Sequence, residues 1–210
     1  MGLLDDAELV ILEDGLVTAA MFTGRRRPSA EAALAAVIAA RSGIRADDIE
    51  LDWACDECGS RHGAPAVEYP PGPGGVPWRG DAAAHGSLLV AASALGVRIG
   101  IGFAPGEVGG AVEDAAFHRS ELDAIDSTPP GARESVRAVL WARKSALLRA
   151  LGHSALLEPS ALALSAPTAD GAPGRIARPV AEVGAIWGEV RIHDLVVPGA
   201  GAVAALAVLP

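Results

Sequence analysis

The order of strand-like and helical patterns constrains the fold of this chain more than any other feature of its sequence. In the first half we predict strands at 9–21 (interrupted at Asp14-Gly15), 49–54 and 88–94, and a helix at 30–41. In the second half we predict strands at 97–103, 162–164, 183–187, 190–195 and 202–208, and helices at 113–125 and 136–151. Because strands and helices do not alternate strictly, we expect an α+β fold rather than a doubly wound sheet.

The ends of the predicted helices are marked by single residues. Ser29 is a favourable N-cap for the first helix, and Glu31 in its first turn complements the helix dipole. Gly43 and Gly152 are suited to end the first helix and the last one. A break at 129–131, Pro-Pro-Gly, separates the two helices of the second half.

The predicted elements divide the chain into two halves, 1–94 and 95–210. Each half shows a helical pattern with about three strands. This arrangement indicates a duplication, although no residue-level repeat is visible in the sequence.

Composition and charge narrow the classes of protein to which the chain can belong. Half of its residues are hydrophobic and a fifth are charged, which excludes intrinsic disorder. Aromatic residues make up only 4%, so Ala, Leu and Val must form most of the core. The formal net charge of −9 argues against a nucleic-acid partner and against binding to an anionic membrane surface.

No segment of the sequence resembles a targeting signal or a membrane span. Residues 1–13 include four acidic side chains, unlike a secretory signal, which begins with basic residues and continues as an apolar run. The longest apolar candidate, 196–209, is too short for a transmembrane helix and contains Pro198 and two glycines. We therefore predict a soluble, cytoplasmic protein.

The two cysteines form a single C-x-x-C pair. Cys55 and Cys58 could bind zinc together with His62, and a fourth ligand such as His85 would have to come from a distant segment. The second C-x-x-C that usually completes such a site is absent. We therefore predict that 55–65 is a compact loop without a metal.

Five segments of the chain follow a recognisable order of motifs. They are C-x-x-C-G-x-x-H-G-x-P at 55–65, A-H-G at 84–86, V-R-I-G-I-G-F-A at 97–104, Phe117 with Glu121 and Leu122, and W-A-R-K-S-A-L-L-R-A-L-G at 141–152. In this order and at this spacing they resemble bacterial phosphopantetheinyl transferases of the surfactin-synthetase type. The resemblance covers nearly the whole chain.

The resemblance implies a fold and an activity. The family folds as a pseudo-twofold pair of similar α+β halves. It transfers 4′-phosphopantetheine from coenzyme A to a serine of an acyl- or peptidyl-carrier protein. Mg²⁺ neutralises the phosphates and is held by carboxylates of the family's D-I-E and K-E-A motifs.

This chain departs from the family at the residues that bind the metal. The two acidic residues of D-I-E are replaced by Gly102 and Ala104, and the glutamate of K-E-A is replaced by Ser145. Ala64 replaces a lysine expected near the nucleotide end of the coenzyme. We therefore expect no metal site and impaired catalysis. A shifted Mg²⁺ site using Glu107 or Glu113 is the alternative.

Cationic residues of the family's site are largely retained. The resemblance implies that His85 and Lys144 contact phosphate and act in catalysis, and that both also bind the cofactor together with Arg149. Arg25, Arg26 and Arg27 form a basic turn before a helix N-terminus, where side-chain donors and the helix dipole favour an anion such as a phosphate of coenzyme A.

Three functions are compatible with these residues. The first is a transferase with an unusual metal site. The second is a non-catalytic homologue that binds coenzyme A weakly between the halves, or that binds a carrier protein. The third is an enzyme of specialised metabolism that uses the pocket for other chemistry, although no G-x-S-x-G motif supports it.

Overall fold

The computed structural model describes residues 2–54, 59–105, 116–152, 157–181, 183–196 and 201–210. The strands are β1 (Glu8–Leu12), β2 (Val17–Thr23), β3 (Glu50–Ala54), β4 (Arg61–Tyr69), β5 (Trp78–His85), β6 (Leu88–Leu95), β7 (Arg98–Pro105), β8 (Arg191–Leu195) and β9 (Ala202–Leu209). The α-helices are α1 (Ala30–Ser42), α2 (Arg119–Asp126) and α3 (Arg133–Leu151). The predicted α+β class is confirmed.

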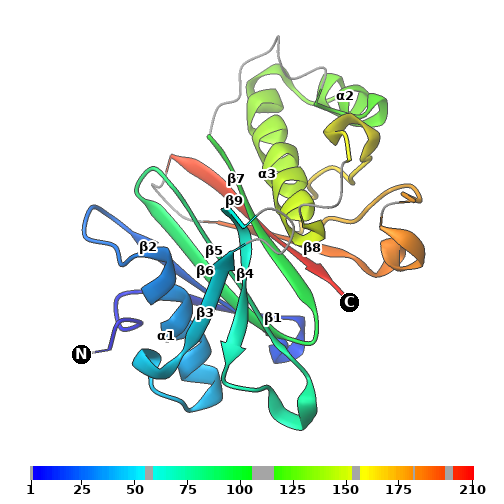
Figure 1. Cartoon of the computed structure of the whole chain (residues 1–210). Helices are drawn as coiled ribbons and strands as arrows, with labels where there is room; N and C mark the ends of the chain where they lie inside the picture. Colours follow the sequence, from blue (N-terminus) through cyan, green and yellow to red (C-terminus); the bar gives the residue numbers. More distant parts are fainter. Residues whose placement is uncertain (1, 55–58, 106–115, 153–156, 182, 197–200) are drawn as a thin grey trace.

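The strands form two antiparallel sheets that stack on one another. The large sheet has the order β1-β2-β6-β5-β4-β3, and the small sheet has the order β7-β9-β8. Figure 1 shows α1 on one side of the pair of sheets and α3 on the other. The described chain is therefore built in four layers, namely helix, large sheet, small sheet and helix.

Side-chain alternation in the central strands creates these layers. In β9, Ala204, Leu206 and Val208 face the large sheet, whereas the residues between them face α3. In β6, Leu88 and Val90 face the small sheet, whereas Leu89 faces α1. Because both faces of these strands are covered, their sequences are almost continuously apolar.

Strand β7 and helix α3 approach each other unusually closely. A Cβ atom added to Gly100 or Gly102 would come closer than 3.0 Å to backbone atoms of α3. The facing residues of α3 include Ala142, Ala146 and Ala150, which are all buried. Glycine on the strand and alanine on the helix thus allow the two backbones to pack against one another.

The predicted start and end signals of the helices are confirmed. Ser29 caps α1, because its side chain accepts a hydrogen bond from the Ala32 N–H, and Gly43 ends α1 with a φ of 74°. Gly152 follows the last residue of α3. The interruption at Asp14-Gly15 lies in the connection between β1 and β2.

Several predicted elements are wrong. Residues 61–65 belong to β4 rather than to a loop, and β5 was not predicted before His85. The predicted strand at 183–187 coincides with the 3-10 helix Gly184–Glu189, because Gly184 adopts a φ of 72°, which a strand does not allow. The predicted strand at 162–164 is reduced to one bridge between Leu164 and Ile176.

The helix predicted at 113–125 is shorter than expected. Helix α2 begins at Arg119 after the N-cap His118. Glu121 accepts a hydrogen bond from the His118 backbone N–H in return, which completes a capping box. The first part of the predicted helix, 113–115, lies outside the described residues.

The two sheets separate the chain close to the predicted boundary. Residues 8–95 supply every strand of the large sheet, and residues 98–209 supply every strand of the small sheet. The prediction of about three strands in the first half is wrong, because six of its described segments are strands. No helix in the described part of the chain is long and apolar enough to cross a membrane.

Candidate functional site

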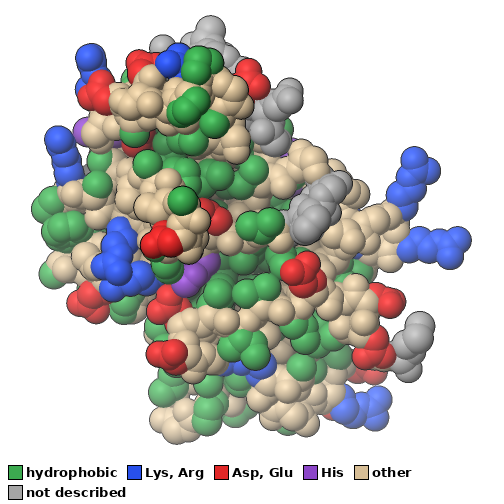
Figure 2. Space-filling view, turned by 180° about the vertical axis from the view of Figure 1, so that it is seen from behind, with side chains coloured by type: hydrophobic (Ala, Val, Ile, Leu, Met, Phe, Trp, Pro, Cys, Tyr) green, Lys and Arg blue, Asp and Glu red, His purple; other side chains and the backbone are tan. Residues whose placement is uncertain are grey.

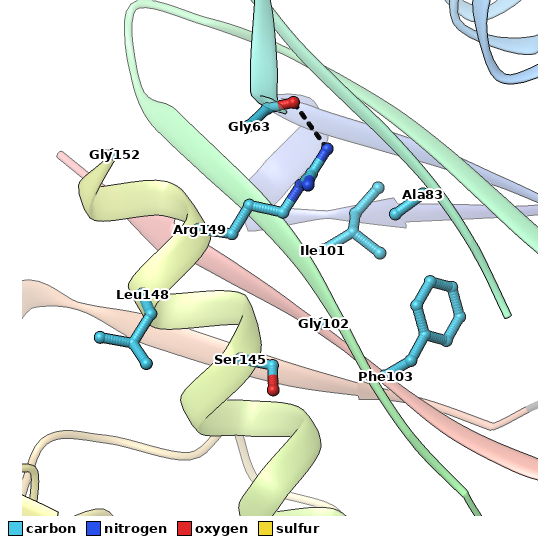
Figure 3. A pocket seen from close by; sticks show the side chains of 9 residues that line it. All are labelled: Gly63, Ala83, Ile101, Gly102, Phe103, Ser145, Leu148, Arg149 and Gly152. Atoms are coloured by element: carbon cyan, nitrogen blue, oxygen red, sulfur yellow. Dashed lines mark hydrogen bonds between the residues drawn. The ribbon is translucent and has the colours of Figure 1, made fainter. Parts of the chain in front are cut away.

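A pocket of about 450 Å³ lies where α3 and β7 meet the large sheet. Its lining residues come from β4, β5, β7 and the second half of α3, and are Gly63, Ala83, Ile101, Gly102, Phe103, Ser145, Leu148, Arg149 and Gly152. Figure 3 shows Arg149 reaching from α3 toward Gly63, whereas the ring of Phe103 lies toward the other end of the pocket. Two positions at which the family has a metal-binding carboxylate, 102 and 145, therefore line one pocket with Arg149.

The wall of the pocket at Gly102 is bare backbone. A Cβ atom at this position would overlap with the backbone N of Ala146 and the carbonyl O of Ala142. Ser145, on the adjacent turn of α3, is half-buried and lines the same pocket. The close packing of β7 on α3 therefore leaves no room for a side chain at position 102.

Arg149 is held in place by a buried carboxylate. Its Nε and Nη2 donate to the two carboxylate oxygens of Asp81 at 2.7 and 2.8 Å, and Nη2 also donates to the Gly63 carbonyl at 2.7 Å. Asp81 is fully buried and accepts a further hydrogen bond from the Ile101 backbone N–H at 2.8 Å. The Arg149 charge is thus compensated within the protein, and the pair joins α3 to both sheets.

We expect Arg149→Lys to lower the free energy of unfolding. A lysine keeps the charge but cannot bind both Asp81 oxygens and Gly63 at once, so the loss is about 1–2 kcal/mol. Urea unfolding of both proteins measures this difference. The same change at exposed Arg178 should have no effect, and an equal loss at both positions would show that the Asp81 contacts contribute little.

His85 lies next to the pocket, on the same side of β5 as Asp81 and Ala83. These residues occupy alternate positions of the strand, so their side chains point to one face of the sheet. The exposed imidazole of His85 stacks on the Phe103 ring, with the centroids 6.1 Å apart and an interplanar angle of 23°. Through Phe103, His85 is connected to the wall of the pocket.

The predicted basic turn, Arg25–Arg27, lies beside the turn that joins β5 to β6. The Gly24 N–H donates to the Ser87 carbonyl, and the Arg27 guanidinium donates to the Gly86 carbonyl at 3.1 Å. Arg25 and Arg26 are exposed and have no hydrogen-bond partner among the described residues. Basic side chains project into the solvent at the edge of the molecule where this turn lies, at the right of Figure 2. The structure thus places the arginine turn against the backbone at Gly86 and Ser87, directly after His85.

The prediction that Lys144 contacts a ligand is not supported. Its side chain is 0% exposed, and its ammonium lies 2.8 Å from the Glu121 carboxylate. The same ammonium donates to the carbonyls of Pro159 and Leu162 at 2.5 and 2.6 Å. These three contacts use all three N–H donors of a lysine, so Lys144 is a core residue rather than a phosphate ligand.

The residues present do not fit the magnesium site that the resemblance implies. Gly102 has no side chain, Ala104 is buried on the face of β7 that packs against α3, and Ser145 offers only a hydroxyl. The Asp81 carboxylate accepts a hydrogen bond from Ile101 in this wall, but it is already bound by Arg149. Among the described residues, no group of three His, Cys, Asp or Glu side chains could hold a metal ion.

Four residues named as possible metal ligands cannot be placed. Glu107 and Glu113, proposed for a shifted magnesium site, lie outside the described residues. The same holds for Cys55 and Cys58 of the possible zinc site, and the side chain of His62 is also not described.

Two important residues of the site were missed by the sequence analysis. Asp81 looks like an ordinary acidic residue because its partner, Arg149, is far away in the sequence, and because β5 itself was not predicted. Phe103 was quoted only as part of a motif. If β5 had been predicted, the alternation of side chains along a strand would have placed Asp81 and His85 on one face.

The sequence matches no protein-family model and no curated protein.

Proposed function

We propose that this protein is a phosphopantetheinyl-transferase-like protein that binds coenzyme A, or a similar phosphorylated ligand, without transferring its phosphopantetheine group. The pseudo-twofold relation of the two halves is part of this proposal. The observation that carries it is the convergence of the resembling segments. Gly102, Ser145 and Arg149 line one pocket, and His85 stacks on its Phe103 wall.

The charge distribution indicates which end of such a ligand binds where. The Arg149 charge is already compensated by Asp81, so the pocket itself has little attraction for a second anion. Arg25 and Arg26 of the arginine turn are exposed, and Arg27 reaches the carbonyl of Gly86, the residue that follows His85. A phosphate of the ligand therefore binds at Arg25–Arg27 and His85, where it gains charge-assisted hydrogen bonds. The less polar part of the ligand lies along Phe103 and Ile101.

Impaired transfer follows from the chemistry of the site. The family's reaction develops negative charge on a pyrophosphate, and carboxylate-bound Mg²⁺ neutralises that charge. In this chain the corresponding positions hold Gly102, Ala104 and Ser145, none of which can supply a carboxylate. The arginine turn and His85 remain available to an anion while the carboxylates that would hold Mg²⁺ are missing, so binding and transfer are separable.

We expect binding of coenzyme A without formation of a holo carrier protein. Incubation with coenzyme A, Mg²⁺ and an apo acyl-carrier protein should leave the mass of the carrier unchanged. Isothermal titration should show weak binding of coenzyme A, of similar strength with Mg²⁺ and with EDTA. Arg27→Ala and His85→Ala should each lower the affinity roughly tenfold, because each removes a contact to the phosphate.

Arg178→Ala, which changes an exposed arginine far from the turn in sequence, is the matched control and should bind normally. Holo-carrier formation well above background would contradict the proposed absence of transfer and would favour a shifted metal site. Absence of binding by the unaltered protein would contradict the coenzyme proposal. A complex with the carrier protein alone would then favour a protein–protein role.

A further inference from the structure

A second pocket, of about 400 Å³, lies on the side of the large sheet that carries α1. Its walls include Arg41 at the end of α1, Tyr69, Trp78 and the prolines 70, 71 and 73. None of these residues belongs to the pocket at Gly102. The volume is within the range of small-molecule sites.

Arg41 supplies a cation without a described counter-charge. Its guanidinium lies over the Trp78 ring, 5.1 Å from the centroid. It donates to the carbonyls of Ser93 and Gly15 at 2.7 and 3.0 Å. Within the part of the chain that the structure describes, no Asp or Glu oxygen lies within 4.0 Å of it. Its Nη1 also lies 3.4 Å from the Ser93 hydroxyl, and a guanidinium has five N–H donors, so these three partners leave others for a ligand.

Partial burial makes an anion at this position favourable. Burial lowers the pKa of Arg41 below its usual value, because it removes part of the water that solvates the charge. The planar guanidinium matches the geometry of a carboxylate, with which it forms two parallel hydrogen bonds. A single cation calls for a monoanion rather than for a phosphate, which carries up to two negative charges.

Most of the other side chains that line this pocket are apolar rings, those of a tyrosine and three prolines. Tyr69 is 40% exposed although it borders the pocket, Pro70 is buried, and Pro71 and Pro73 are exposed. Aromatic rings pack well against such a surface. Tyr69 and the prolines thus provide a surface for an aromatic ring next to the cation of Arg41.

We propose that this pocket binds a small carboxylic acid that carries an aromatic ring. The carboxylate pairs with Arg41, and the ring packs on Tyr69 and the neighbouring prolines. This site is independent of the proposed coenzyme site and does not rest on it.

Tyr69 allows a direct test, because it is the only tyrosine in the sequence. Protein labelled with 3-fluorotyrosine has one fluorine resonance, and that resonance reports on this pocket. Titration with 3-phenylpropanoate should shift it in a saturable way, whereas the uncharged 3-phenylpropanamide should bind at least roughly tenfold more weakly. Coenzyme A should leave the resonance unchanged.

Arg41→Lys should weaken binding of the acid at least roughly tenfold, because lysine cannot pair with both carboxylate oxygens. Arg45→Lys is the control, since Arg45 lies just beyond the end of α1 and its side chain is exposed. No saturable shift with the acid at tens of millimolar, or equal shifts with acid and amide, would overturn the proposal. The comparison of acid with amide uses the unaltered sequence, so it holds even if the Arg41 variant does not fold.

Discussion

An aspartate at position 102 is expected to unfold the protein rather than to restore a metal ligand. The Cβ atom alone would overlap with the backbone of α3 at Ala142 and Ala146, and backbone cannot move aside as the end of a side chain can. Overpacking and a buried carboxylate without a partner together cost about 4 kcal/mol or more. That loss is comparable with the whole stability of a small domain.

Urea unfolding and near-ultraviolet circular dichroism measure this effect. Gly131→Asp is the matched control, because no atom lies within 4 Å of a Cβ at Gly131 and its φ is not positive. The control should keep the stability of the unaltered protein. A folded Gly102→Asp variant with normal stability would show that α3 can move away from β7, and that the pocket could regain a carboxylate.

Lys144→Met is expected to destabilise the protein strongly without opening a ligand site. It removes the cation that compensates Glu121, whose carboxylate also accepts hydrogen bonds from the backbone N–H groups of His118 and Leu164. Removing one member of a buried ion pair costs about 3–5 kcal/mol. The double variant Glu121→Gln, Lys144→Met should recover a large part of this loss, because it leaves no unpaired charge.

Lys144 can also be observed directly, because it is the only lysine in the sequence. An amine-reactive ester should therefore modify the native protein only at its terminal amino group, and should modify Lys144 after unfolding in urea. Rapid modification of Lys144 in the native protein, or a single variant as stable as the unaltered chain, would contradict the buried position.

The same ion pair predicts how stability depends on pH. Burial lowers the pKa of Lys144 below its ordinary value of 10.5, and attraction to Glu121 offsets only part of the shift. Between the lowered pKa and 10.5 the unfolded chain binds more protons than the folded one, so the contribution of Lys144 to the free energy of unfolding rises with pH. The stability difference between the unaltered protein and Lys144→Met should therefore widen as the pH approaches 10.5.

Features decided by single residues were predictable from the sequence. The ends of α1 follow from Ser29 and Gly43, whose effects depend only on the local backbone. The end of α3 follows from Gly152 in the same way. Strands β6 and β9 were likewise predictable, because β9 is apolar throughout and β6 is interrupted only by Ser93.

Features decided by distant contacts were not predictable. Strand β5 contains Gly80 and three consecutive alanines, which have little preference for a strand, and its conformation is imposed by pairing with β6 and by Leu34 of α1 against Gly80. The sequence does not indicate whether Lys144 is exposed or buried. Its burial depends on the ion pair with Glu121, which only the fold brings into contact. Within the site, the family resemblance pointed to positions 102, 145 and 149, which line one pocket. The role of Asp81 could not be predicted, because it depends on β5, which the sequence did not indicate.

The central place of β9 in the small sheet has a consequence for the order of folding. The large sheet needs only strands from residues 8–95, and even its β2–β6 pairing, which joins Val17 to Ala94, lies within the first half of the chain. Strand β7 has no partner in the small sheet except β9, which comes about a hundred residues later in the chain. Before β9 pairs with β7, the glycines of β7 and the alanines of α3 have no neighbouring strand to hold them in contact. We therefore expect the small sheet to form after the large one, and the pocket at Gly102 to be completed last.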